Sequence, residues 1–352
     1  MAKVLMKGNE AIGEAAIQAG CQAFFGYPIT PQSEIPEYLA REMPKRGGVF
    51  LQAESELSAM NMVMGASASG ARVMTSTSGP GYCLKLETLA VMTLTRLPAV
   101  VVVIQRSGPG FGTMKAAQED YRMTGNGGYK VVTLAPSTIQ EAAEMTFEAF
   151  DIADKYRNPV VVMADAIIGQ MMEGVDFAQM PSAYSDLPAK DWALHGSNAR
   201  GGKPYFHYVA EGRSHYGEKH EAETVLYPQI IENETRVEIV DVKDADIVLA
   251  SYGTAARMCR SIMAENKGPI KLGLIRPKTL WPFPYKAFDE IGPNCKAILC
   301  PELNIVGQMI DDVRIAAAGR WPVTHVGDTA QDFLQPENIQ QAIQQLWQEV
   351  GQ

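Results

Sequence analysis

Short apolar runs alternate with longer segments of helical periodicity along the first half of the chain. Apolar, strand-like runs lie at 23–26, 49–52, 72–75, 99–105, 130–134 and 160–164. Segments expected to be helical lie between them, at 33–42, 56–68, 82–93 and 139–156. Runs such as AVVVVIQ and PVVVMAD are apolar on both faces, which is typical of strands buried in a parallel sheet. The alternation predicts a doubly wound α/β domain over roughly residues 1–185.

The pattern lapses at 186–240, where the chain is polar, aromatic and irregular. We expect a linker or covering segment there. A second, smaller set of alternating elements follows over 241–352, with DIVLASYG and KLGLIRP as strands and QPENIQQAIQQLWQEV as a closing amphipathic helix. The sequence therefore predicts an α/β protein with two doubly wound parallel-sheet domains.

Composition narrows the class of protein. Hydrophobic residues make up 46% and charged residues 20% of the 352 positions, as in a well-packed globule. The net charge of −9 without a basic stripe argues against a nucleic-acid ligand. The longest purely apolar run, 99–104, is too short to cross a membrane, and the first residues lack the apolar core of a signal peptide. We therefore expect a cytoplasmic protein.

Metal chemistry has little support in the sequence. The five cysteines form no C-x-x-C pair, so this chain is not expected to hold an iron–sulfur cluster or a disulfide framework. The five histidines all lie in the second half and lack a spacing such as H-E-x-x-H. No metal site is predicted on this chain.

The loop GYPITP, directly after the strand predicted at 23–26, is the first candidate site. In open parallel sheets, ligands bind beyond the carboxyl ends of the strands. The prolines at 28 and 31 fix their own φ angles and push Tyr27 and Thr30 towards extended geometry. This stiffness fits a plain turn, and it fits equally a preorganised Thr30 hydroxyl that donates to a small anionic or carbonyl ligand.

Glu56 opens the helix predicted at 56–68, which is otherwise small and apolar. An acid in the first turn is favoured by the helix dipole by about 0.3–1 kcal/mol, and Glu54 could serve that purpose equally well. If Glu56 points inward instead, burial would disfavour its charged form and let it share a proton with a ligand nitrogen. The residues alone leave both interpretations open and slightly favour the first.

Two glycine-rich loops follow strands, TSTSGPG at 75–81 and RSGPGFG at 106–112. Neither contains G-K-[ST], which excludes a P-loop, and G-x-G-x-G at 108–112 is not the dinucleotide fingerprint. Arg106 places a guanidinium at the end of an apolar strand. It is either solvated or placed to bind a carboxylate through two hydrogen bonds.

Together these motifs resemble the α-type subunit of 2-oxoacid:ferredoxin oxidoreductases. The resemblance rests on YPITPQSEIPEYL, QAESELSAMNMVMGASASGARVMTSTSGPG and VVVVIQRSGPGFGT. DADIVLASYGTAAR, GLIRPKTLWPFP and PELNIVGQ look like that family's second domain, which is similar to the C-terminal domain of transketolases. The resemblance spans nearly the whole chain except the stretch near 186–235. It is closest to the branched-chain type, 3-methyl-2-oxobutanoate (2-oxoisovalerate) dehydrogenase, with the 2-oxoglutarate type next.

The resemblance implies a thiamine diphosphate-dependent enzyme that decarboxylates a 2-oxoacid oxidatively to an acyl-CoA and passes the electrons to ferredoxin. In the family, the first domain binds the pyrimidine ring of the cofactor. The family's glutamate that hydrogen-bonds this ring falls on Glu56, with Tyr27 and Pro28 also on the cofactor. Its threonine that meets the 2-oxoacid falls on Thr30, and Arg106 matches the position that holds the substrate carboxylate.

The resemblance also implies partner subunits. No G-D-G run for Mg²⁺ and diphosphate occurs here, and cluster cysteines are missing. In the family both reside on a β-type subunit, sometimes with γ- and δ-type chains, so this chain would supply half of an active site. A β chain of a lipoamide-linked 2-oxoacid dehydrogenase has a similar layout but lacks these loops, and a non-catalytic assembly subunit would not need Glu56 or Arg106. No second cation obviously meets a distal substrate carboxylate, which favours the branched-chain type, although Arg122 or Lys115 could do so.

Overall fold

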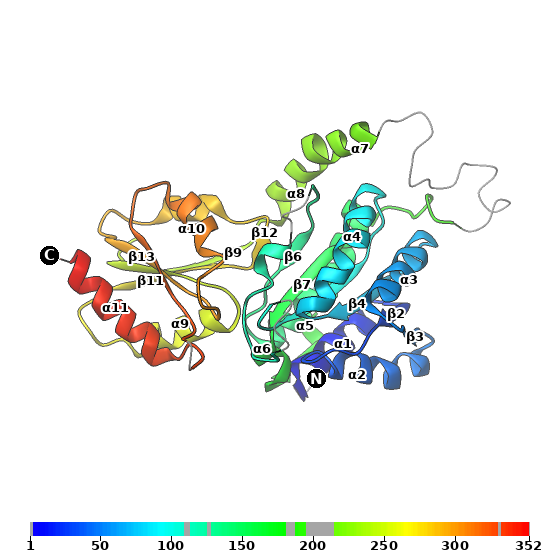
Figure 1. Cartoon of the computed structure of the whole chain (residues 1–352), viewed down its shortest axis with the longest axis horizontal. Coiled ribbons are helices and arrows are strands. Elements are labelled where there is room, and N and C mark those ends of the chain that lie inside the picture. Colours follow the sequence, from blue (N-terminus) through cyan, green and yellow to red (C-terminus); the bar gives the residue numbers. More distant parts are fainter. Residues whose placement is uncertain are drawn as a thin grey trace.

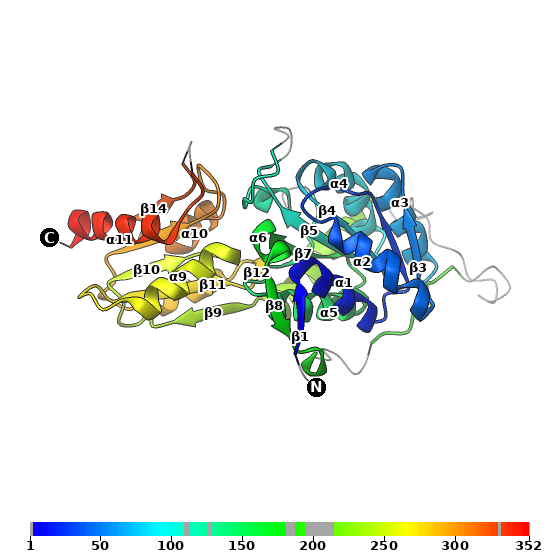
Figure 2. The same cartoon turned by 90° about the horizontal axis from the view of Figure 1, so that it is seen from below.

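The computed structural model describes residues 3–108, 113–124, 128–180, 187–194, 215–329 and 332–351. Two α/β units lie side by side along the long axis of the molecule (Figures 1 and 2). The larger unit contains the N-terminus, and the smaller unit ends in the C-terminal helix at the far left of Figure 1. The two doubly wound domains expected from the sequence are therefore present.

The larger unit is built on a seven-stranded sheet. Its strands are β2 (Ala23–Gly26), β3 (Val49–Gln52), β4 (Val73–Thr77), β5 (Val100–Gln105), β6 (Val132–Leu134), β7 (Val160–Asp165) and β12 (Thr279–Trp281). They are ordered β12-β6-β7-β5-β4-β2-β3. All neighbours run parallel except β12, which comes from the second half of the chain and pairs antiparallel with β6. The smaller unit thus lends the larger one an edge strand.

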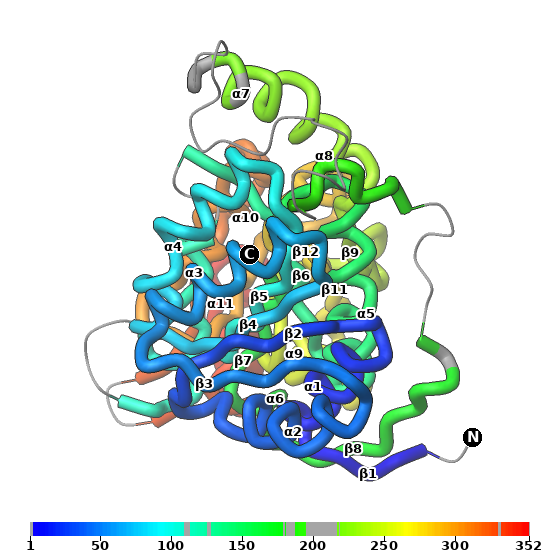
Figure 3. The backbone as a smooth tube through the Cα atoms, turned by 90° about the vertical axis from the view of Figure 1, so that its right-hand side faces the viewer, coloured from blue at the N-terminus to red at the C-terminus, as the bar shows by residue number. Residues whose placement is uncertain are grey.

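Helices cover both faces of this sheet (Figure 3). Its helices are α1 (Gly8–Gln18), α2 (Glu34–Glu42), α3 (Glu56–Ala68), α4 (Gly79–Leu94), α5 (Ile139–Tyr156) and α6 (Ala166–Gln170). Side chains of α1, α2 and α5 share a core with Val100 and Val102 of β5, whereas α3 and α4 share one with Val101 and Val103. The alternation of side chains along β5 explains why one strand serves two cores. A small antiparallel pair, β1 (Val4–Lys7) and β8 (Met172–Val175), lies outside this sheet.

The smaller unit has a five-stranded sheet in the order β14-β13-β10-β11-β9. Its elements are β9 (Val237–Val240), β10 (Ile247–Ala250), α9 (Gly253–Glu265), β11 (Leu272–Pro277), β13 (Ala297–Pro301), α10 (Ile310–Ala317), β14 (Val323–Val326) and α11 (Pro336–Val350). Four strands are parallel and β9 is antiparallel at the edge. One face of the sheet packs on α9 and α11, and the other on α10. Short 3₁₀ helices lie at Pro44–Arg46, Tyr121–Met123, Phe177–Gln179 and Tyr285–Glu290.

The stretch 186–240 differs from the irregular segment expected. A helical run extends through α7 (His215–Glu221), a π-helical turn (Ala222–Leu226) and α8 (Tyr227–Glu234), and β9 then joins the second sheet before residue 241. Ala222, Leu226 and Ile230 are buried against the larger unit at a spacing of four residues. This spacing is the helical signal that the polar composition of the stretch conceals. Residues 195–214 lie outside the described part.

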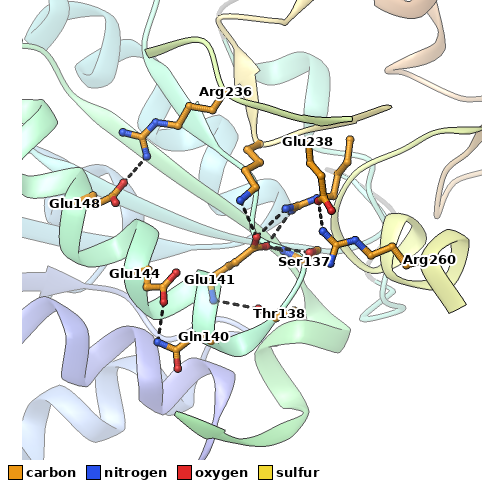
Figure 4. A network of polar contacts seen from close by, with 11 residues as sticks. Ser137, Thr138, Gln140, Glu141, Glu144, Glu148, Arg236, Glu238 and Arg260 are labelled. Carbon is orange, nitrogen blue, oxygen red and sulfur yellow. Dashed lines mark hydrogen bonds and ion pairs between the residues drawn. The ribbon is translucent and has the colours of Figure 1, made fainter. Parts of the chain in front are cut away.

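A network of ion pairs joins the two units (Figure 4). The fully buried Arg276 of β11 donates through Nη1 and Nη2 to Glu141 of α5, at 2.9 and 2.7 Å. Its Nε donates to Glu238 of β9, at 2.6 Å. Burial alone would raise the pKa of Glu141, but the guanidinium of Arg276 and the N–H of Ser137 overcome this and hold the pKa at about 2. The network fixes the smaller unit against the larger one through an ionised carboxylate.

Candidate active site

Glu56 is the first residue of α3, and its side chain turns into the protein instead of capping its own helix. The capping is done by Ser55, whose hydroxyl accepts from the N–H of Ser58. Glu54 accepts from the Ser58 hydroxyl at the exposed end of the helix. Because these residues bind the start of the helix, Glu56 is not needed there. Its side chain is only 3% exposed. Of the two placements considered from the sequence, the structure has the inward one.

The Glu56 carboxylate is held from two sides. Thr77, the last residue of β4, donates through its hydroxyl to Oε1 at 2.7 Å. The ammonium of Lys85, on the second turn of α4, lies 2.7 Å from Oε2 and is completely buried. A Cβ atom at residue 81 would lie 2.2 Å from Oε1, so only glycine lets α4 pass this close. Burial lowers the pKa of Lys85, and the charge of Glu56 opposes this.

Thr30 and Arg106 are brought together at the carboxyl ends of β2 and β5. Nη1 of Arg106 donates to the backbone carbonyl of Thr30 at 2.8 Å. Arg106 is 8% exposed, and its Nε has no hydrogen-bond partner among the described residues. The side chains of Tyr27, Pro28 and Thr30 are exposed along the same loop. The guanidinium is therefore largely buried against this loop, and the simple solvated alternative does not describe it.

Gln32 anchors the GYPITP loop, and sequence reasoning missed it. Its amide is completely buried, accepts from the Ser76 hydroxyl of β4 and donates to the carbonyl of Tyr27 at 3.2 Å. The signal in the sequence was a lone glutamine between Pro31 and the helix that follows. The rigidity of the loop thus comes from this buried amide as well as from its prolines.

The first turn of α4 lies between Arg106 and Glu56. Gly79 has φ +42°, and a Cβ atom there would lie 3.1 Å from Nε of Arg106. The N–H of Gly79 donates to Oδ2 of Asp120 at 3.3 Å. Burial raises the pKa of Asp120 to about 7, although N–H groups of Arg106 and Gly79 hydrogen-bond its carboxylate and oppose this. Asp120 belongs to the same cluster, and no motif in the sequence marked it.

Several buried polar atoms of this cluster lack a hydrogen-bond partner among the described residues. They are Ser78 Oγ, Arg106 Nε, Asp120 Oδ1 and Glu56 Oε2, the last of which has only the ion pair with Lys85. Buried polar groups are almost always paired in native proteins, so unpaired groups of complementary charge gathered at a strand end fit a polar ligand. The free guanidinium N–H suits a carboxylate, and the Glu56 oxygens retain lone pairs for a ring N–H. These residues fit both a 2-oxoacid and an aminopyrimidine ring.

The described residues were searched for side chains that could bind a metal ion. All five cysteines are free thiols, and no group of three or more His, Cys, Asp or Glu side chains there is placed to hold a metal ion. The G-x-G-x-G stretch falls largely on 109–112, outside the described part. No helix in the described ranges is long and apolar enough to cross a membrane.

The fold defines a class of protein. Over 97% of both chains, it matches the inactive β4 tetramer of a split-gene transketolase with a TM-score of 0.60 and 15% identity, a likeness of fold alone. A 2-oxoglutarate:ferredoxin oxidoreductase from Magnetococcus marinus matches with a TM-score of 0.82 and 25% identity. That match covers 97% of this chain and 65% of the other. The architecture is thus that of transketolase-like and oxidoreductase chains.

Sequence comparison gives the family. Residues 14–228 match the thiamine diphosphate-binding domain of pyruvate flavodoxin/ferredoxin oxidoreductases, and residues 245–339 match core domain II of pyruvate:ferredoxin oxidoreductase. The chain is 40% identical over 91% of its length to the ketoisovalerate oxidoreductase subunit VorB of Methanothermobacter marburgensis, covering 91% of that protein. It is 35% identical to the 2-oxoglutarate synthase subunit KorA of Methanocaldococcus jannaschii, over 96% of this chain and 98% of that one. The chain therefore belongs to the pyruvate flavodoxin/ferredoxin oxidoreductase family, in which it is similar to subunits of 2-oxoacid oxidoreductases.

Proposed function

We propose that the chain is the α-type subunit of a cytoplasmic, thiamine diphosphate-dependent 2-oxoacid:ferredoxin oxidoreductase that acts on branched-chain 2-oxoacids. The complex would decarboxylate the 2-oxoacid, transfer the acyl group to CoA and pass the electrons to ferredoxin. The observation that carries the proposal is the inward Glu56, held by Thr77 and Lys85 at the carboxyl edge of the sheet. A 2-oxoglutarate-type subunit is the second candidate, supported by the 35% identity to KorA.

The residues of this chain have separate tasks in the proposal. Thiamine diphosphate, when bound, supplies a nucleophilic carbon and accepts the electrons released by decarboxylation. Glu56 accepts a hydrogen bond from a pyrimidine ring nitrogen and so holds a proton there, with Tyr27 and Pro28 beside the ring. Arg106 offers its free Nε–H to the substrate carboxylate. The Thr30 hydroxyl, on the same loop, donates to the 2-oxo group.

The site needs a partner chain. The sequence contains no G-D-G run, so we assign Mg²⁺ and the diphosphate to a β-type subunit, together with the iron–sulfur cluster. The outward sides of α3 and α4 support this, because Leu57 and Leu84 are 46% and 56% exposed there. A groove between the two helices is lined by further apolar side chains, Met64, Val91 and Leu97. A largely apolar helix pair beside a half-built site fits a protein interface. γ- and δ-type chains, which only some complexes of the family contain, are further candidate partners.

The branched-chain assignment rests on the similar proteins and on the surroundings of two basic side chains. A distal carboxylate, as in 2-oxoglutarate, needs a second basic residue. Arg122 is paired with Asp311 of the smaller unit. Lys115 is paired with Asp328 at 3.2 Å and lies over the ring of Phe333. Both basic residues are thus engaged with the second unit, which favours an apolar substrate side chain.

The test is a substrate panel on the complex purified with its natural partners, reading methyl viologen reduction with CoA present. We expect kcat/KM to be highest for 2-oxoisovalerate and its branched homologues. A preference for 2-oxoglutarate would select the second candidate, and copurification with a lipoyl protein would select the lipoamide-linked dehydrogenase. If none of the 2-oxoacids led to methyl viologen reduction, the remaining hypothesis would be a non-catalytic assembly subunit.

Glu56→Gln keeps the shape of the side chain but cannot hold the charge. In the same complex we expect turnover to fall by about 10²–10⁴-fold, the range of general acid–base contributions. Glu54→Gln is the matched control, because Glu54 is an acid beside the start of the same helix that accepts from the Ser58 hydroxyl at its exposed end. Equal activities of the two variants would refute the role of Glu56.

A further inference from the structure

Lys85 is a buried cation that the proposed reaction does not use. Its side chain is completely buried in α4. Besides its ion pair with Glu56 Oε2, its ammonium donates to the Thr75 hydroxyl at 3.1 Å and to the backbone carbonyl of Glu56 at 3.3 Å. Three oxygen atoms therefore surround the ammonium. Lys85 therefore contacts α3 at two points, the side chain and the backbone of one residue.

Packing alone does not explain a lysine here. Its neighbours along α4, Tyr82 and Leu89, and Met60 and Val63 of α3 belong to the apolar core. A buried ion pair generally stabilises a fold no better than apolar residues of the same volume, because both charges must leave water. An apolar residue at position 85 and another at position 56 would fill this core equally well. Stability of the fold therefore does not account for the Lys85–Glu56 ion pair, and we look for its reason in function.

The geometry fixes the direction of the carboxylate and places a cation beside it. The Lys85 ammonium lies 2.7 Å from Oε2 and supplies a countercharge. Thr77 on Oε1 and Lys85 on Oε2 act from β4 and from α4, so the carboxylate cannot rotate without losing one partner. An ionised carboxylate is an acceptor on all its lone pairs. A ring N–H is the group it can bind, whereas an unprotonated ring nitrogen is not.

We propose that Lys85 is a positioning residue that keeps Glu56 ionised and oriented, so that the proton shared with the pyrimidine ring stays on the ring nitrogen. The inference rests on the proposed role of Glu56. Lys85 acts through Glu56 and touches neither cofactor nor substrate. Its removal lets the carboxyl take the proton itself, which turns an acceptor into a donor facing the ring.

The first test reads the protonation of Glu56 without any cofactor. Infrared difference spectroscopy of the full chain at neutral pH compares the wild type, Lys85→Met and Lys85→Met combined with Glu56→Gln. Asp120, with a pKa of about 7, gives the carbonyl stretch of a protonated carboxyl in all three proteins. We expect an additional band of this kind in Lys85→Met and in neither of the other two. If Lys85→Met fails to fold while the double variant folds with a melting temperature near the wild type, the lysine is equally shown to compensate the charge of Glu56. Absence of the additional band in a folded Lys85→Met would overturn the proposal.

The second test uses the reconstituted complex. We expect Lys85→Met to weaken thiamine diphosphate binding about tenfold or more, as for the loss of a charge-assisted hydrogen bond, and to shift the pH profile of kcat. Met92→Leu, at another fully buried position of α4, is the control for packing changes in that helix. Unchanged binding and pH profile would refute the role of Lys85. The proposed function fails separately, when Glu56→Gln keeps full turnover, and that result leaves the infrared outcome untouched.

Discussion

Replacing Glu141 by Gln tests whether the ion pair with Arg276 fixes the two units together. An ordinary glutamate titrates near 4.3, whereas the pKa of Glu141 is about 2. At about 1.36 kcal/mol per pH unit, this difference is worth about 3 kcal/mol of stability at neutral pH. The side chain is 17% exposed, so water screens the pair somewhat. We therefore expect a loss of about 2–3 kcal/mol at pH 7.

The sign of the pH dependence makes the prediction specific. The pKa of Glu141 is lowered in the fold, so its contribution is full above about 4.3 and is lost as the pH falls through about 2. The gap in unfolding free energy between wild type and Glu141→Gln should therefore shrink to about half by pH 3.

Urea unfolding at pH 7 and pH 3, followed by fluorescence, measures this gap. Trp281 is a suitable probe, because it lies on β12, where the smaller unit pairs with the larger sheet. Glu144→Gln is the control, one turn further along α5, where the carboxylate accepts from Gln140 at 2.9 Å. An equal loss in both variants, or a gap that does not change between the two pH values, would refute the reasoning.

Two further predictions concern the substrate end of the site. Arg106→Lys should lower kcat/KM for the 2-oxoacid by about 10–100-fold, because an ammonium cannot bind Thr30 and a carboxylate in the forked geometry. The KM for CoA should stay constant. Steady-state kinetics of the complex measures both, and an unchanged kcat/KM for the 2-oxoacid would show that the arginine is dispensable. Asp120 has a raised pKa of about 7, so below that pH it is neutral and above it its charge competes for Arg106. We expect kcat/KM to fall as the pH rises through about 7 and this limb to vanish in Asp120→Asn; an identical pH profile in both proteins would contradict it.

The local pattern was sufficient for several regular elements of the larger unit. The bounds predicted for β2, β3, α3 and α5 match those of the structure. The sequence missed α1, where two glycines and a mostly small apolar face weaken the helical signal. It could not predict β12, which pairs with β6 through a connection of more than a hundred residues. Such pairings depend on tertiary contacts that no local periodicity encodes.

The candidate site was predictable in part, for the same reason. Thr30, Glu56 and Arg106 stand out because each is a polar residue at the end of an apolar strand or the start of an apolar helix. Lys85 is visible in the sequence as a charged residue on an apolar helical face, but the sequence analysis did not consider it. Asp120 had no local signal, since only the fold carries its loop back to the start of α4.

Helix α4 explains how the two halves of the site are kept in register. Its first turn touches Arg106 at Gly79 and Glu56 at Gly81, and its second turn supplies Lys85. One element therefore sets the positions of Arg106, which we propose binds the substrate carboxylate, and of Glu56, which we propose binds the pyrimidine ring. The strand-to-helix junction TSTSGPG fixes the distance between Arg106 and Glu56. The GYPITP loop then places Thr30 beside Arg106. Glycines at 79 and 81 are what allow a helix to begin so close to two charged side chains.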